Sequence, residues 1–374
     1  MKLRIPSLLV LGSLGLCAAG VCAGPAKGPA ESAEKSLAVY AERFLPFNPQ
    51  SRVSVDRSSE KPLPLFRAYR VRRTGKYEKL NVDRVVHLSE DGKWFFAGET
   101  LVNPSPRPAR SEGDIDWVRE KLAAAYGTRV RLGFAPERDA AGLKALTISL
   151  DTGFFPLQLQ GYVSPDGKGF LLGTLWDFHS DPRQERRRRI DLSAQRALGP
   201  AEAAVTIVEY ADMECGYCRY RGRHLDQLLA ANEGVAKVRR HYKFYPLWKI
   251  HPWAVRAASA GDCLSRFAGP ALFRFKEIVY GMQESLTVTA IDELAITTAE
   301  GLGVSRTDFL SCYLRDESFA DLRRDLEEGH RLGVNSTPTY YVDGTEVFWV
   351  EDKVMEDFLR TKFPALKTVV YAAR

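Results

Sequence analysis

The chain has 374 residues, of which 45% are hydrophobic and 27% are charged, and its formal net charge is +6. At ~150 residues per domain, this length predicts two or three folded units. Much of the charge comes from the run Arg186 to Arg189, and a single basic run is more often a solvated linker face than a binding patch. We therefore expect no nucleic-acid partner.

The first 23 residues have the pattern of a secretory signal peptide. Basic residues precede an apolar core from Leu8 to Leu16, and small residues lead to a cleavage site before Gly24. A membrane anchor would need ~20 apolar residues, and lipid attachment at Cys17 or Cys22 would need a small residue before the cysteine. We expect residues 1–23 to be removed from a soluble protein that is periplasmic or otherwise exported.

A repeat fills the region between this signal and residue 181. Two segments that lie 75 residues apart, Val86–Gly98 and Gly161–Gly173, both carry Asp-Gly between apolar residues, which is a hairpin signal. Each is preceded by a helical stretch, Ala33–Phe44 or Ile115–Tyr126, and by a short strand. The sequence therefore predicts two α+β units, each a helix against an antiparallel sheet, at residues 30–106 and 107–181.

Residues 182–197 are rich in Arg, Gln and Glu, and we interpret them as a charged, helical linker. A second domain, residues 198–374, begins at Leu198-Gly199-Pro200. Its first strand, Val205 to Tyr210, leads through a turn to the sequence Cys215-Gly216-Tyr217-Cys218.

The cysteine pair opens a segment with leucines at helical spacing. Cys215 would lie at the N-terminus of this helix, where the helix dipole favours a thiolate and lowers the thiol pKa. Cys218 would lie one turn further along the same face, within reach of a disulfide to Cys215. The pattern predicts a pair that cycles between dithiol and disulfide.

The rest of the domain alternates between strand and helix patterns. Val238 to Tyr245 predicts a strand parallel to the first, and residues 252–334 predict a helical insertion. The final elements are a strand at Thr339–Val342, a hairpin partner at Thr345–Val350 and a helix at Glu351–Phe363. We expect an α/β fold here.

These motifs resemble thioredoxin-fold thiol-disulfide oxidoreductases. Cys-Gly-Tyr-Cys is similar to the active site of DsbC-type isomerases, whereas residues 198–210 and the helical insertion resemble DsbA-family domains. The two hairpin segments are similar to the DsbC dimerisation domain, which has a cystatin-like fold. The resemblance implies protein clients with disulfides or free thiols, a membrane redox partner and no cofactor.

The resemblance also implies roles for particular residues. Pro338 would be cis beside the cysteines, and the Thr337 backbone would pair with an extended peptide, with Gly216 and Tyr217 also contacting substrate. A proline that merely precedes a strand is the alternative. Glu209 would exchange protons with Cys218, its pKa raised by burial.

Four residues outside the motif need an interpretation. Lys243, on the neighbouring strand, is a candidate charge partner for Glu209, and we expect His251 to be structural. Cys263 and Cys312 lie on predicted helices of the insertion and could form a structural disulfide; the alternative is a second redox centre.

Two function classes remain. The first is an oxidoreductase or isomerase acting on protein disulfides, with its direction undecided. The second is a copper- or zinc-binding module that uses Cys215 and Cys218, although a zinc site normally needs a second C-x-x-C or paired histidines. The tandem repeats predict a monomer with a pseudo-twofold platform, with a homodimer as the alternative.

Overall fold

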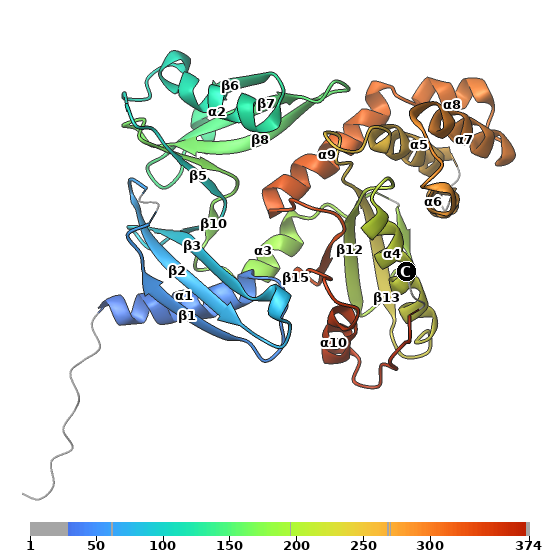
Figure 1. Ribbon diagram of the computed structural model, residues 1–374, viewed down its shortest axis with the longest axis horizontal. Coiled ribbons are helices and arrows are strands. Elements are labelled where there is room, and N and C mark those ends of the chain that lie inside the picture. The colour runs from blue at the N-terminus through green and yellow to red at the C-terminus, as the bar shows by residue number, and fades with distance from the viewer. Residues whose placement is uncertain (1–28, 61–62, 195, 268, 270, 372–374) are drawn as a thin grey trace, which may run out of the picture.

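The computed structural model describes residues 29–371 except 61–62, 195, 268 and 270. The expected signal peptide, residues 1–23, lies outside the described residues. Among the helices that are described, none combines the length and the apolar character needed to span a bilayer. The described residues build three five-stranded sheets, two in the N-terminal half and one in the C-terminal half (Figure 1).

The first N-terminal unit packs one helix against an antiparallel sheet. Its elements are α1 (Pro29–Phe44), β1 (Arg52–Arg57), β2 (Phe66–Thr74), β3 (Val82–Ser89) and β4 (Trp94–Phe96). The turn between β3 and β4 contains Gly92 at φ +73°, which a residue without a Cβ adopts at no steric cost.

The second unit repeats this order. Its elements are α2 (Asp116–Tyr126), β6 (Val130–Phe134), β7 (Lys144–Asp151), β8 (Pro156–Val163) and β9 (Gly169–Leu172). Apolar side chains from both units, including Leu37, Phe95, Val118 and Ile148, join one buried cluster that continues into the C-terminal half.

The two units exchange their last strands. β5 (Glu99–Val102) follows the first unit but pairs antiparallel with β9 of the second, so that Thr100 lies opposite Leu171. β10 (Trp176–Asp177) follows the second unit but pairs antiparallel with β4 of the first, with Trp176 opposite Phe95. The sheet orders are therefore β1-β2-β3-β4-β10 and β6-β7-β8-β9-β5.

The C-terminal half is built on a mixed sheet of order β11-β13-β12-β14-β15. The strands are β11 (Ala197–Leu198), β12 (Val205–Ala211), β13 (Val238–Phe244), β14 (Thr339–Val342) and β15 (Thr345–Val347), and the flanking helices are α4 (Gly216–Ala230) and α10 (Lys353–Lys362). β12 runs parallel to β13 and antiparallel to β14. Nearly all of β12 is buried because both faces of the sheet are covered.

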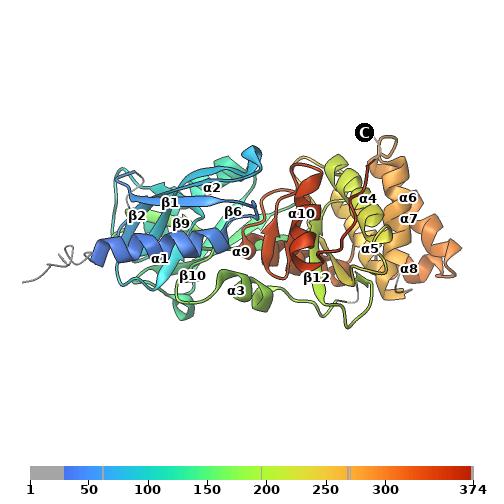
Figure 2. The same ribbon diagram turned by 90° about the horizontal axis from the view of Figure 1, so that it is seen from below.

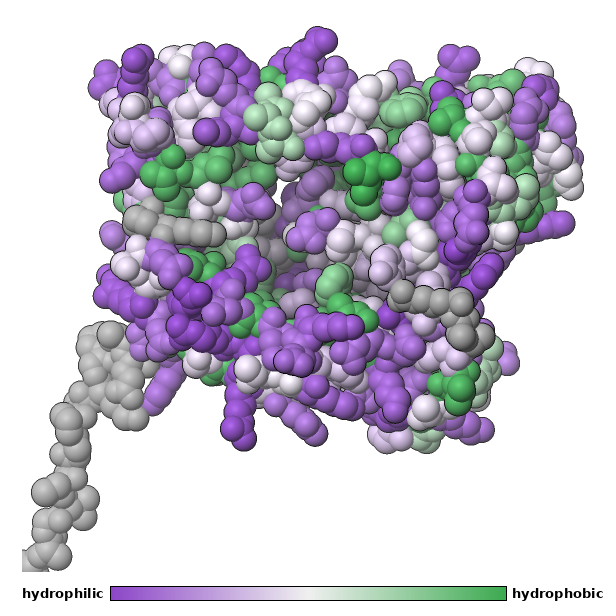
Figure 3. All heavy atoms as spheres, viewed as in Figure 1, coloured by the Kyte–Doolittle hydropathy of each residue, from purple (hydrophilic) through white to green (hydrophobic). Residues whose placement is uncertain are grey.

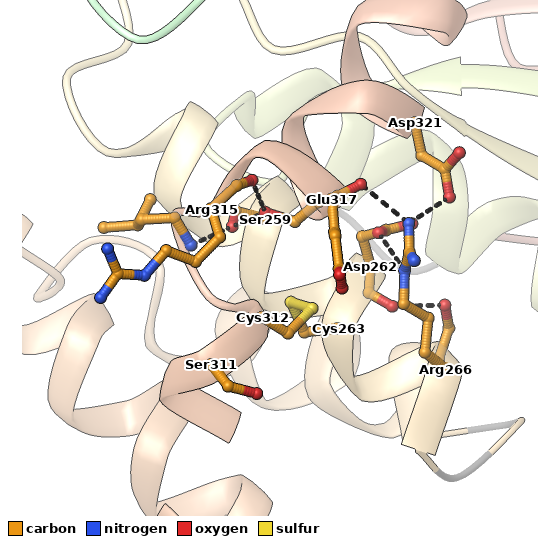
Figure 4. Close-up of a disulfide and its surroundings, with 12 residues drawn as sticks. Ser259, Asp262, Cys263, Arg266, Ser311, Cys312, Arg315, Glu317 and Asp321 are labelled. Carbon is orange, nitrogen blue, oxygen red and sulfur yellow. Dashed lines mark hydrogen bonds and ion pairs between the residues drawn. A yellow bond between two sulfur atoms is a disulfide. The ribbon is translucent and has the colours of Figure 1, made fainter. Parts of the chain in front are cut away.

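A helical insertion separates β13 from β14. It comprises α5 (Ala254–Phe267), α6 (Ala271–Met282), α7 (Val288–Gly301), α8 (Arg306–Cys312) and α9 (Asp316–Leu332). Cys263 on α5 and Cys312 on α8 form a buried disulfide that links these two helices (Figure 4).

The segment expected to be a solvated linker is instead packed between the two halves. It contains α3 (Pro182–Arg189), and only 1% of Arg186 is exposed. The Arg186 guanidinium lies 4.6 Å from the ring centroid of Phe44 and 5.6 Å from that of Tyr341. Cation–π contacts with aromatic rings from both halves stabilise Arg186 in this buried position. Part of the basic run therefore packs between the two halves and is not exposed to solvent.

Both N-terminal units contact the C-terminal half. The Tyr77 hydroxyl donates to the Asp357 carboxylate on α10 at 2.5 Å, and the Gln158 N–H donates to the Glu327 carboxylate on α9 at 3.0 Å. Between these contacts lies a cleft of about 1750 Å³, seen as the central hollow in Figure 3. In the orthogonal view the two halves lie side by side along the longest axis (Figure 2).

Candidate active site

Cys215 lies where β12 gives way to α4. It is the N-cap residue of that helix, and its own N–H donates to the Asp212 carbonyl at 3.2 Å. The site is positioned by a buried strand on one side and a helix on the other. Hydrogen bonding to the Cys218 thiol lowers the pKa of Cys215 to about 6, as a donor to the charged form should.

Cys218 is fully buried one turn along α4, and its sulfur accepts the Asp212 N–H at 3.4 Å. Burial, followed by the neighbouring Cys215, raises the pKa of Cys218 well above its usual range. The two thiols thus have opposite tendencies: Cys215 favours the thiolate near neutral pH, whereas Cys218 keeps its proton.

The Thr337–Pro338 peptide bond is cis. The Cys215 thiol donates to the Thr337 carbonyl at 3.4 Å, so this loop lies directly against the first cysteine. Gly216 and Tyr217 are exposed, and Tyr217 has 59% of its surface open to solvent. Cys215 thus has the Thr337 carbonyl beside its thiol, and the exposed residues Gly216 and Tyr217 follow it directly in the chain.

Glu209 is buried on β12 and pairs with an arginine. Its carboxylate accepts from Arg240 Nε at 3.0 Å and from the Tyr340 hydroxyl at 3.1 Å. The prediction that Lys243 pairs with Glu209 is wrong, because the Lys243 ammonium lies 3.0 Å from Asp325 and from Glu328.

The strand register explains this difference. Glu209 lies opposite Tyr242 across the parallel pair. Because side chains alternate between the two faces of a strand, Arg240 shares the face of Glu209 and Lys243 points to the other face.

Asp212 is a residue that the sequence interpretation missed. Its buried carboxylate accepts the N–H groups of Glu214 and Leu247 at 2.7 Å and lies 2.7 Å from His251 Nδ1. These contacts fasten the active-site turn to the segment that follows β13. The hydrogen bond to Asp212 raises the pKa of His251 and places its imidazole beside the active-site turn.

Glu214, directly before Cys215, was also missed. It accepts the N–H of Trp253, at the start of the insertion, at 2.8 Å. Burial raises the pKa of Glu214 to about 7. The position of these two acidic residues just before Cys215 could have marked them as site candidates. Their partners His251 and Trp253 could not be identified from the sequence, because each lies 39 residues further along the chain.

The cleft between the two halves ends beside these groups. Its walls include Leu247 to Ile250, which lead to His251, and Ser336, which precedes Thr337. No group of three or more His, Cys, Asp or Glu side chains suited to holding a metal ion occurs within the described part of the chain.

Several known proteins are similar to part of this chain. Among curated proteins, the Na(+)/H(+) antiporter NhaA 3 of Salinispora tropica is 28% identical over 155 residues, 41% of this chain and 22% of that protein. NhaA of Herminiimonas arsenicoxydans is 28% identical over 156 residues, 41% of this chain and 23% of that protein. The chain thus spans about a quarter of the length of these relatives or less.

Solved structures match a similar share of the chain. BdbD from Bacillus subtilis is 18% identical and covers 46% of this chain and 94% of its own, with a TM-score of 0.41. The catalytic domain of Proteus mirabilis ScsC is 18% identical and covers 48% of this chain and 96% of its own, with a TM-score of 0.40. The family model described as Thioredoxin matches residues 192–360. This part of the chain is therefore a thioredoxin-fold domain.

Proposed function

We propose that this chain is an exported thiol-disulfide oxidoreductase that acts on protein disulfides. The observation that carries the proposal is the pair Cys215–Cys218 at the start of α4, in which the first thiol has its pKa lowered to about 6 and the second has its pKa raised. A nucleophile that is ionised at neutral pH, beside a protonated second thiol, is the arrangement that thiol-disulfide exchange requires.

The reaction follows from this asymmetry. The Cys215 thiolate attacks one sulfur of a client disulfide; a mixed disulfide forms, and the released client sulfur takes a proton. Cys218 then loses its proton and attacks Cys215, which releases the second client thiol and leaves the Cys215–Cys218 disulfide. Two electrons pass from enzyme to client, and the reverse sequence oxidises a client dithiol.

Glu209 is the candidate for exchanging the Cys218 proton. It is buried in the same domain, and its carboxylate retains contact with Arg240 and Tyr340. The Thr337 backbone, Gly216 and Tyr217 border Cys215, and we assign them to client binding. An extended client chain would lie along this loop and continue into the cleft beside Ser336.

The N-terminal units would then act as a client-binding platform for one catalytic domain. Strand exchange within the chain supports a monomer, since the strand that could pair with another copy is taken up by the tandem unit. Light scattering tests this: we expect the mass of one chain. A stable dimer that dissociates when residues 24–182 are removed would contradict the monomer.

Two variants test the activity. Cys215→Ser should abolish reduction of insulin by the reduced protein, because the attacking thiolate is gone. Cys218→Ser should instead accumulate mixed disulfides, which mass spectrometry detects after non-reducing electrophoresis. Turnover by Cys215→Ser at the wild-type rate would overturn the proposal. The redox potential of the pair, measured against glutathione, then decides between an oxidase and a reductase or isomerase.

A further inference from the structure

The residues between the two cysteines carry no charge. Gly216 and Tyr217 cannot offer a cation to the Cys215 thiolate. The buried Asp212 carboxylate lies on the same turn, and its like charge raises the pKa of Cys215. The Cys218 thiol is the main group that lowers the pKa of Cys215, and a cation held beside Asp212 would in addition offset the Asp212 charge.

His251 occupies the place of such a cation. It lies on the segment between β13 and α5, with Nδ1 2.7 Å from Asp212 Oδ2, and its side chain is 21% exposed. The groups that face it from the active-site turn are Asp212, Glu214 and Cys215. Lys249, the nearby cation on its own segment, donates instead to the Ala125 carbonyl in the second N-terminal unit.

We infer that His251 is a positioning residue whose positive charge, held by Asp212, favours the Cys215 thiolate and so sets how oxidising the Cys215–Cys218 pair is. The inference rests on the proposed function. Coupling between two sites is reciprocal: the Cys215 thiolate favours protonated His251, so protonated His251 favours the thiolate to the same extent. Loss of the imidazolium would also leave Asp212 uncompensated.

The direction with pH follows from the raised pKa of His251. The imidazolium is present below that pKa and is lost as the pH rises through it. Its support for the thiolate is therefore present below the raised pKa of His251 and fades above it. A stabilised thiolate stabilises the reduced pair and so makes the pair more oxidising. The effect of His251 on the redox potential of the pair should therefore be largest below the pKa of His251.

The decisive variant is His251→Gln in the full chain. Glutamine can still donate a hydrogen bond to Asp212 but carries no charge, so the turn keeps its anchor. We expect the pKa of Cys215, followed by thiolate absorbance at 240 nm, to rise by about 1, as loss of a nearby opposite charge implies. The equilibrium with glutathione should shift about tenfold towards the disulfide form, which corresponds to ~30 mV.

Two further variants separate charge from structure. His251→Lys restores a cation and should return the pKa of Cys215 towards the wild-type value, without the change at alkaline pH. His241→Gln, at a half-buried histidine on β13 opposite Val208, is the matched control and should leave the pKa of Cys215 unchanged.

Unchanged values for the Cys215 pKa and the glutathione equilibrium in His251→Gln would overturn the inference, as would an equal effect of His241→Gln. Failure of the wild-type pair to equilibrate with glutathione at all would instead contradict the proposed function. The two failures are therefore distinguishable.

Discussion

A Cβ atom at Gly344 would lie 2.0 Å from the carbonyl oxygen of Arg183. Gly344 forms the turn between β14 and β15 at φ +78°, and Arg183 lies in the first turn of α3. The catalytic sheet and the connecting helix therefore meet backbone to backbone. Only glycine permits both the positive φ and this approach.

Gly344→Ala should consequently destabilise the protein, by about 1–3 kcal/mol for the strained backbone alone. Denaturant titration followed by tryptophan fluorescence measures the change in midpoint. Gly234→Ala is the control, because a Cβ there meets no atom within 4 Å. Equal midpoints for both variants would show that α3 moves away from the turn without cost.

The reactivity of Cys215 should depend on pH with a midpoint near 6. Below that pH the thiol is protonated and slow; above it the thiolate reacts at a constant rate. Because the Cys218 thiol is the main cause of the lowered pKa of Cys215, Cys218→Ala should move the midpoint upward, whereas Cys218→Ser retains a donor and should move it less. Iodoacetamide alkylation rates between pH 4 and pH 9 measure both. Identical midpoints in the two variants would contradict this account.

Glu209→Gln should be strongly destabilising. The substitution leaves Arg240, of which 3% is exposed, without its buried counter-charge, and breaking a buried ion pair costs about 3–5 kcal/mol. Asp226→Asn removes the other carboxylate that contacts Arg240, but Asp226 is 46% exposed, so about 0.5 kcal/mol is expected. Urea unfolding compares the two. A cost below that of Asp226→Asn would rule out a stabilising role for the Glu209–Arg240 pair.

Removal of the Cys263–Cys312 disulfide should affect stability and leave thiol exchange intact. The bridge closes a loop with a sequence separation of 49, and loss of such a loop constraint costs about 4 kcal/mol on the chain-entropy model. The double variant Cys263→Ser/Cys312→Ser tests this by thermal unfolding, together with insulin reduction at 25 °C. If the variant stays stable but stops turning over, the bridge is the second redox centre rather than a structural link.

The sequence predicted local elements better than contacts between them. The sequence predicts a strand at Thr339–Val342, and β14 has these bounds in the structure. The partner of Glu209 could not be obtained in this way, because choosing between Arg240 and Lys243 requires the register of two parallel strands. Asp212 and His251 meet only after β13 returns the chain to the active-site turn.

The exchange of strands between the two N-terminal units could also not be predicted from the sequence. β5 and β10 are short, four residues and two residues, and carry little periodic signal. Their pairing is decided by which sheet edge is nearest once both units have folded, which is a long-range property of the chain. The prediction that the basic run at Arg186 is a solvated linker failed for a related reason. Composition alone does not show that the aromatic rings of residues 44 and 341 pack against it.

Strand exchange has a consequence for how the N-terminal half folds. Neither sheet is complete until the other unit has been synthesised and has supplied its strand, so the two units should unfold together in a single transition. A chain cut between residues 106 and 107 should yield fragments that are incomplete separately, because the first lacks β10 and the second lacks β5. When the fragments are mixed, they should reassemble. Such complementation is expected of two units that fold cooperatively and is not expected of two independently folding domains.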